Sequence, residues 1–169
     1  MMDIKRKLKN FGSLELLVLS SIIYIVVMLM WTATTRDEVL QKANDIKSNH
    51  KIVVDFMNNE VNKCSSDDDA LTSWGEKCIS VWTSSKIVNY ILLNMSLKNP
   101  YSIDKPLIQT SQDPRIQAEG KAGQSTDKGI IFVSSSNFEA EAGSEWVVGT
   151  CVKSPCVAAG NNELISVYR

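Results

Sequence analysis

Few side chains in this chain of 169 residues could do chemistry. There is one histidine, His50, and the four cysteines all lie after residue 63. The sequence contains no GxSxG, Walker or HExxH motif. A cysteine–histidine pair is not expected either, because His50 stands alone and the cysteines suit disulfides. We therefore predict that the protein is not an enzyme and has no catalytic residues, no metal site and no cofactor.

A lone carboxylate, Glu15, stands at the start of an apolar run. From Leu16 to Thr35 there are 20 residues without a charge, which is about the length that a helix needs to cross a bilayer. Four basic residues precede the run and favour a cytoplasmic N-terminus: Lys5, Arg6, Lys7 and Lys9. We expect the chain to cross a membrane here, with the remainder on the far side.

Three interpretations of this segment compete. It could be an ordinary cleaved signal peptide, a permanent single-span anchor, or the membrane segment of a subunit that loses a short leader. A signal peptide fits poorly, because the apolar run exceeds the usual hydrophobic region and only a weak small-residue cleavage site occurs, near Ala33.

The four cysteines indicate disulfides better than they indicate zinc. An even number of cysteines after a translocated segment suggests two disulfides in an oxidising compartment. Of the three possible pairings we favour Cys64–Cys78 and Cys151–Cys156, because each pair is near in sequence. A zinc site would need ligand spacings and histidines that the sequence does not offer. Asp67, Asp68 and Asp69 suit a solvated cap or turn better than a calcium loop.

The helical pattern continues beyond the apolar run. Residues 13–63 contain no proline and no glycine. One helix is predicted from about residue 14 to about residue 62, with a membrane half at 11–35 and an amphipathic half at 36–63. Steps of three and four place one stripe on a single face: Val39, Ala43, Ile46, His50, Val53, Val54, Met57 and Val61. We expect this stripe to pack on a sheet, with a helix-to-helix filament contact as the secondary alternative, and we expect His50 to be a partly buried structural residue.

The remaining residues predict a short helix and a sheet. The second helix is expected at 79–97, followed by an ordered loop at 98–117 that holds three of the four prolines. Strands are expected at 129–135, 144–152 and 163–169, with a hairpin signal at 158–163. The predicted fold class is α+β, with a long N-terminal helix packed on an antiparallel sheet of three or four strands.

The stretch FGSLELLVLSSIIYIVV, residues 11–27, resembles the N-terminal segment of type IV pilins and pseudopilins. That family has a short basic leader, then a phenylalanine, three mostly small or apolar residues, a glutamate and a long apolar run. Phe11 matches the first mature residue, and Glu15 matches the acid that follows it. The cysteine-bounded stretch at 151–156 is similar to the disulfide-bounded segment near the C-terminus of many pilins.

The resemblance implies a type IV pilin-like fold and a specific order of processing and assembly steps. Residues 1–10 would be a leader, cut between Asn10 and Phe11 by a prepilin peptidase that also methylates Phe11. The subunit would wait in the inner membrane with its N-terminus cytoplasmic and its head, residues 64–169, outside. Assembly machinery would then build an extracellular homo-oligomeric filament. Glu15 would set the register by pairing with the amine of Phe11 on a neighbouring subunit.

Two departures from the family pattern concern this segment. Asn10 stands where the family has glycine, and no proline interrupts the membrane half. A cut after Gly12 would lose the spacing from Phe11 to Glu15, so we favour Asn10/Phe11.

Several functions stay open. The leading prediction is a structural pilin, with a minor pilin or type II secretion pseudopilin as a close variant. Adhesion, motility and DNA uptake are family roles between which the sequence does not choose. A rival of another class is a single-span, membrane-anchored extracytoplasmic binding domain. Nucleic acid is not a required partner, since 18 basic residues balance 19 acidic ones.

Overall fold

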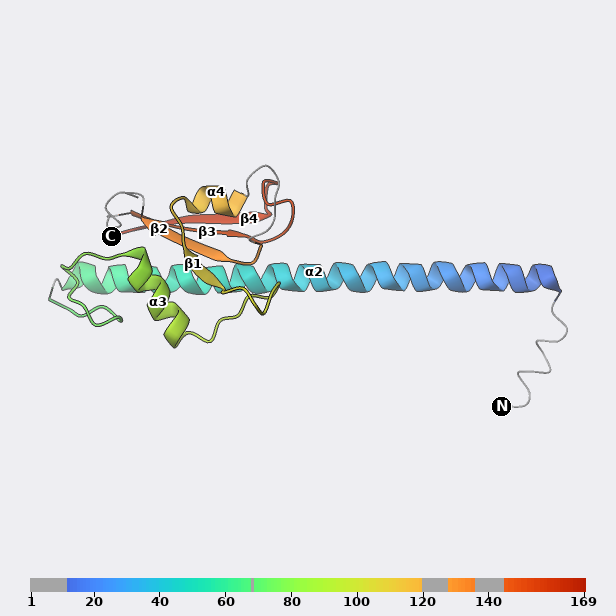
Figure 1. The fold of residues 1–169 in the computed structure, drawn as a ribbon, viewed down its shortest axis with the longest axis horizontal. Helices are drawn as coiled ribbons and strands as arrows, with labels where there is room; N and C mark the ends of the chain where they lie inside the picture. Colours follow the sequence, from blue (N-terminus) through green and yellow to red (C-terminus); the bar gives the residue numbers. More distant parts are fainter. Residues whose placement is uncertain (1–11, 68, 120–127, 136–144) are drawn as a thin grey trace. The chain divides into compact units, whose positions relative to one another are not determined.

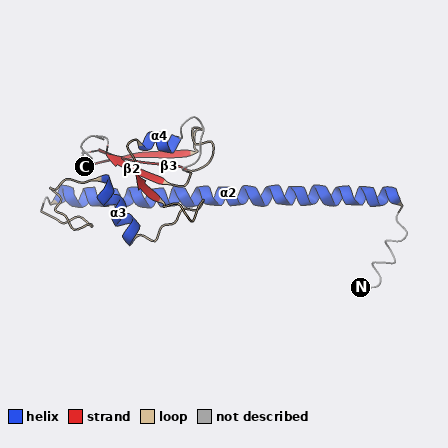
Figure 2. Cartoon of the chain, in the orientation of Figure 1, coloured by secondary structure: helices blue, strands red, loops and turns tan. Residues whose placement is uncertain are grey.

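The computed structural model describes residues 12–67, 69–119, 128–135 and 145–169 (Figure 1). Contacts divide the chain into two units, Met1–Leu40 and Gln41–Arg169, and we call the second the head unit. The helices and strands among the described residues follow one another in the order α2 Ser13–Ser66, α3 Ser84–Asn94, β1 Ile108–Thr110, α4 Pro114–Glu119, β2 Ile131–Ser135, β3 Glu145–Cys151 and β4 Asn162–Tyr168. Figure 2 shows this mixture of helices and strands, which confirms the predicted α+β class.

The long helix α2 lies close to the predicted range, beginning one residue earlier and ending four residues later. It carries an acid, Glu15, in its first turn and a base, Lys63, in its last turn. Both charges complement the helix dipole, which is positive at the N-terminus and negative at the C-terminus. The extra residues at its end include Cys64, which is buried and disulfide-bonded.

In the head unit, α2 buries one face. The buried residues are Ala43, Ile46, His50, Val53, Val54, Met57, Glu60 and Cys64. They keep the predicted steps of three and four, so the amphipathic pattern predicted this face correctly. Two members of the predicted stripe differ: Val39 is 42% exposed, and Val61 is only partly buried.

The sheet has the strand order β1-β2-β3-β4 and is mixed. β2 pairs with β3, and β3 with β4, in antiparallel fashion as predicted. However, β1 runs parallel to β2, with Ile108 opposite Ile131. The prediction of a purely antiparallel sheet was therefore wrong, because three residues in the segment predicted as a loop form a strand.

The two faces of the sheet are covered by different helices. Trp146 and Val148 of β3 belong to the main core together with the buried face of α2. The short helix α4 contacts β2, β3 and β4. At Gly149, a Cβ atom would lie 2.7 Å from the carbonyl oxygen of Pro114 and 3.1 Å from the Cβ of Ala118. Glycine at this position therefore lets α4 approach the strand closely.

The helix α3 is shorter than predicted. Thr83 is its N-cap, with extended backbone angles and a side-chain oxygen that accepts a hydrogen bond from Lys86 N at 3.4 Å. The cap excludes residues 79–83 from the helix, although their apolar spacing resembles a helix. At the other end, Met95 is extended and its N–H bonds the carbonyl of Ile91.

Candidate functional site

The first turn of α2 holds the carboxylate that the sequence singles out. The N–H of Gly12 donates a hydrogen bond to Oε2 of Glu15 at 3.0 Å. The N–H of Leu16 closes the first turn on the carbonyl of Gly12 at 3.2 Å. Glu15 thus supplies the glutamate half of a capping box, three residues into the helix. Gly12 has no side chain to supply the other half.

The expected partner of Glu15 lies outside the described residues. Asn10 and Phe11, the predicted cleavage and methylation positions, are both in that undescribed segment. Within the described residues, Glu15 is exposed and bonds its own helix. Its carboxylate therefore already has a local role, which satisfies one of the free N–H groups at the helix start.

Polar side chains inside the apolar run bond to the helix backbone. Ser20 donates to the carbonyl of Leu17 at 2.9 Å, and Thr32 donates to that of Leu29 at 2.9 Å. The same pattern holds for Ser21, Thr34 and Thr35. Such hydroxyls carry no unmet hydrogen bond into an apolar medium. The run therefore stays compatible with lipid despite its serines and threonines.

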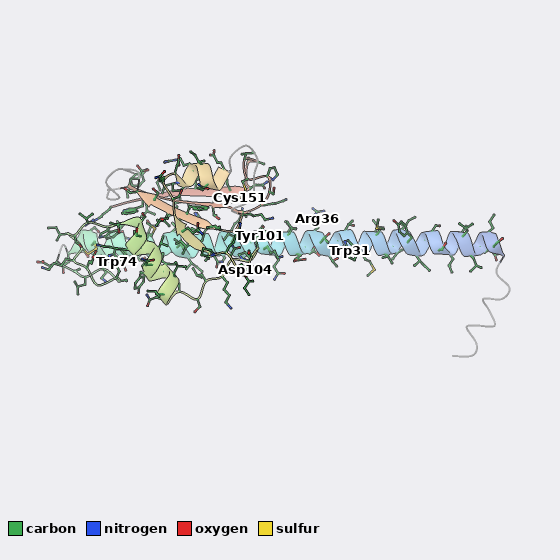
Figure 3. All side chains as sticks on the ribbon, viewed as in Figure 1. Trp31, Arg36, Trp74, Tyr101, Asp104 and Cys151 are labelled. Carbon is green, nitrogen blue, oxygen red and sulfur yellow. A yellow bond between two sulfur atoms is a disulfide. The ribbon has the colours of Figure 1, made fainter. Side chains whose placement is uncertain are left out.

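The apolar side chains of this segment are exposed in the single chain. Leu14 is 76% exposed and Trp31 is 69% exposed, and Figure 3 shows Trp31 on the helix. Among the described residues, α2 is long and apolar enough to cross a membrane. Trp31 has the chemistry of an interfacial anchor. A surface of this kind needs lipid or other apolar segments to cover it.

His50 joins α2 to the sheet inside the head unit. Its Nε2 lies 3.2 Å from the carbonyl oxygen of Val148, and the side chain is 2% exposed. Burial lowers the pKa of His50, although the hydrogen bond to Val148 and the charge of Glu163 act in the opposite direction. A neutral imidazole that donates through Nε2 meets these conditions. His50 is thus a structural residue and is more deeply buried than predicted.

A buried acid that the sequence did not single out ties α2 to the loop that follows it. Glu60 is 5% exposed, and its carboxylate accepts hydrogen bonds from the N–H of Ser73, at 2.8 Å, and from the Ser73 hydroxyl. The spacing of the sequence could have indicated that Glu60 is buried, because it lies three residues after Met57 and four before Cys64 on the buried face. The acid fixes the loop over the end of the helix.

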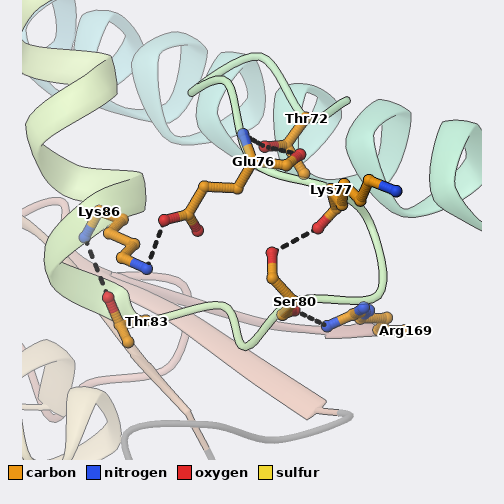
Figure 4. A network of polar contacts seen from close by, with 7 residues as sticks. All are labelled: Thr72, Glu76, Lys77, Ser80, Thr83, Lys86 and Arg169. Carbon is orange, nitrogen blue, oxygen red and sulfur yellow. Dashed lines mark hydrogen bonds and ion pairs between the residues drawn. The ribbon is translucent and has the colours of Figure 1, made fainter. Parts of the chain in front are cut away.

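The same loop is held by a disulfide and by polar contacts. Cys64 and Cys78 are bonded, with Cα atoms 5.2 Å apart. Figure 4 shows the surrounding network, in which Lys86 Nζ lies 2.6 Å from Oε1 of Glu76. The guanidinium of Arg169 donates to the carbonyls of Cys78 and Ser80 and lies over the ring of Trp82 at 4.6 Å.

The second disulfide closes the connection between β3 and β4. Cys151 and Cys156 are bonded, with Cα atoms 5.3 Å apart. The N–H of Val152 bonds the carbonyl of Asn161 at 2.8 Å, which extends the ladder by one pair beyond the strands. Both disulfides join the cysteine pairs that the sequence favoured, and residues 152–161 connect the two strands, close to the predicted position.

The described residues contain no group of three histidine, cysteine or acidic side chains that could hold a metal ion. Asp68, the middle residue of the acidic triplet, lies outside them. Asp67 accepts a bond from the N–H of Asp69 at 3.0 Å, and Asp69 pairs with Lys77 at 2.8 Å. These two acids thus take part in a turn and a surface ion pair.

Comparison with family models, with curated proteins and with solved structures finds no match for this chain.

Proposed function

We propose that this chain is the structural subunit of a type IV pilus-like extracellular filament, polymerising through α2 after a leader is cut between Asn10 and Phe11. The proposal rests on one observation. Glu15 lies in the first turn of a helix, and the 20 residues that follow it are uncharged and exposed. An acid in this place is costly in a bilayer unless it finds a partner. A bundle of such helices would cover the apolar surface and could supply that partner from a neighbouring subunit.

The proposal implies a location for the subunit before assembly and a set of partners. The subunit would be held in the inner membrane by residues 11–35, with the head unit on the extracytoplasmic side. The two disulfides favour this placement, because they form and persist in oxidising compartments. Prepilin peptidase and the filament assembly machinery would be its partners. A minor pilin or a type II secretion pseudopilin would share the same helix but not a long filament.

A second candidate is a membrane-anchored extracytoplasmic binding domain that never assembles. The observation in its favour is that the head unit has its own core and its own disulfides. On this alternative, Glu15 would serve only as the cap of its own helix.

Mass spectrometry of the mature N-terminus separates the two candidates. The full chain would be expressed in a host with a prepilin peptidase and in a matched strain without one. The filament proposal expects a chain that starts at methylated Phe11 in the first host only. Asn10→Gly, which introduces the residue typical of the family, should be processed at least as fast. An intact N-terminus in assembled, functional protein would contradict the filament proposal.

A further inference from the structure

A groove of about 480 Å³ lies in the head unit, along the loop after α3. The apolar part of its lining includes Leu92, Leu97, Pro100, Pro106 and Leu107. The volume falls within the usual range for small-molecule sites, and such sites combine apolar walls with a few polar groups. The loop itself is well fixed, since the hydroxyl of Tyr101 donates to the carbonyl of Val152 at 2.6 Å.

The polar groups of this groove are mostly hydrogen-bond donors. Lys98 and Lys105 line it, and among the described residues no carboxylate does. Asn99 also lines it and is 8% exposed. Its Oδ1 is used, because it accepts the N–H of Tyr101 at 2.8 Å. Its Nδ2 is a buried donor without a partner in the described part of the chain. The two ammonium groups of the lining form a setting for an anionic group.

An exposed apolar side chain lines the groove, and a further cation lies over the ring of a lining residue. Ile103 lines it and is 94% exposed, although isoleucine is usually buried. Lys128 places its Nζ 4.4 Å from the centre of the Tyr101 ring. One acid, Asp104, belongs to the same loop and is exposed (Figure 3), but it does not line the groove. The surface thus combines an exposed apolar tip with three lysines and one aspartate.

We propose that this groove binds the phosphate headgroup of an anionic phospholipid, with Ile103 entering the lipid interface. This inference rests on the membrane anchoring within the proposed function but not on leader cleavage or filament assembly. Apolar insertion together with lysines near an anionic surface is a general mode of membrane association. The apolar walls and Ile103 favour a lipid over a free phosphate ion, which would use the lysines alone.

The covalent link to the membrane segment strengthens the case. A head unit that is tethered to a bilayer meets lipid headgroups at high effective concentration, so weak individual contacts suffice. Each lysine near an anionic surface strengthens the association roughly fivefold. The lipid would hold the head at the membrane before assembly, and the subunit would leave this contact on extraction.

Hydrogen exchange on the full chain in nanodiscs tests the proposal. In phosphatidylcholine discs, amides of residues 98–107 should exchange as in detergent. Adding phosphatidylglycerol should slow their exchange at least fivefold, and high salt should reverse the effect. Lys98→Glu with Lys105→Glu should abolish the slowing, and Ile103→Ser should weaken it. The matched control Lys63→Glu reverses an exposed charge in the last turn of α2, outside the lining of the groove, and should keep it.

The outcomes separate this proposal from its rivals. Equal exchange in both disc types, with the chain inserted, would overturn the lipid site and leave the anchor intact. Slowing by inorganic phosphate alone in phosphatidylcholine discs would show a simple ion site and also overturn it. Failure of the chain to insert at all would instead contradict the membrane anchor. Lipid-dependent slowing in a chain that never forms filaments would support the lipid site and count against the filament.

Discussion

The Nε2 of His50 lies 3.2 Å from the carbonyl oxygen of Val148, and this contact joins the buried face of α2 to the inner strand β3. The imidazole is the single histidine of the chain and is almost fully buried. Burial lowers its pKa, so the folded protein holds it neutral at a pH where an exposed histidine would begin to take up a proton. The burial of His50 therefore makes the stability of the head unit depend on pH, and the hydrogen bond to Val148 partly opposes this effect.

The first prediction concerns that dependence. In the unfolded chain His50 has its ordinary pKa of 6.5, and in the folded chain its pKa is lower. Below pH 6.5 the unfolded state binds more protons than the folded state. The stability that neutral His50 contributes is therefore complete above pH 6.5 and is lost as the pH decreases toward the lower pKa of the folded state. The slope should not exceed about 1.4 kcal/mol per pH unit for one proton. Chemical unfolding of the full chain in detergent, from about pH 5 to about pH 8, measures it.

His50→Gln is the matched control for this measurement. Glutamine stays neutral and can still donate to the Val148 carbonyl. The variant should lose the histidine part of the pH dependence while keeping a stability near neutral pH within about 2 kcal/mol of the native chain. A variant with an unchanged pH profile would show that the dependence does not come from His50.

The second prediction concerns Arg169, which fastens the disulfide loop. Its guanidinium lies over the ring of Trp82 and donates to the carbonyls of Ser80 and Cys78. Arg169→Lys keeps the charge but loses the planar donor pair, so it should cost about 1 kcal/mol of unfolding free energy. Arg169→Gln should cost somewhat more. Thermal unfolding measures both, and a lysine variant equal to the native chain would show that the charge alone matters.

The third prediction compares the two disulfides. The cysteines of Cys64–Cys78 are 14 positions apart in sequence, and those of Cys151–Cys156 are 5 apart. Because a longer loop restricts the unfolded chain more, replacing the first pair by serines should cost about 3 kcal/mol and the second about 2 kcal/mol. Urea unfolding of the two double variants gives the comparison. The reverse order would indicate that packing of the exchanged side chains dominates loop entropy.

Local patterns predicted a large part of this fold. The range of α2 and its buried face follow from the spacing of apolar residues, which needs no knowledge of the partner surface. The strands β2, β3 and β4 lie in β-branched runs, and the disulfide pairs are near in sequence. Glu15 became a candidate because it is isolated in an apolar stretch; its bond to the Gly12 N–H was not predicted, and its role in assembly stays a prediction.

What the sequence did not predict depends on distant residues. Strand β1 has only three residues, and its pairing of Ile108 with Ile131 joins segments more than twenty positions apart. The helix α4 has six residues, which is too short for a periodic signal. The contact of Arg169 with Trp82 likewise brings together residues more than eighty positions apart in the sequence. Local spacing carries no information about such contacts.

The fourth prediction tests the close approach of α4 to the sheet. In Gly149→Ala the new methyl group would lie 2.7 Å from the Pro114 carbonyl oxygen and 2.8 Å from Cδ2 of Leu164. The helix must move away, at an expected cost of about 1–3 kcal/mol. The control Ser166→Ala changes an adjacent strand without adding volume, although it removes a bond to Glu145. Unfolding midpoints compare the two, and native stability in Gly149→Ala would mean that α4 shifts without cost.

The last prediction separates the two roles of Glu15, which are capping its own helix and pairing with a neighbouring subunit. Glu15→Gln keeps an oxygen that can accept the Gly12 N–H but removes the charge, whereas Glu15→Val removes both. If a charged partner sets assembly, both variants should insert in the membrane while filament yield drops about tenfold or more, since a buried ion pair that loses one partner is strongly destabilised. If capping matters most, only the valine variant should fail. Filament yield and membrane content are measured together by immunoblotting of sheared and cell fractions, and normal yield in Glu15→Val would show that the acid has no part in assembly.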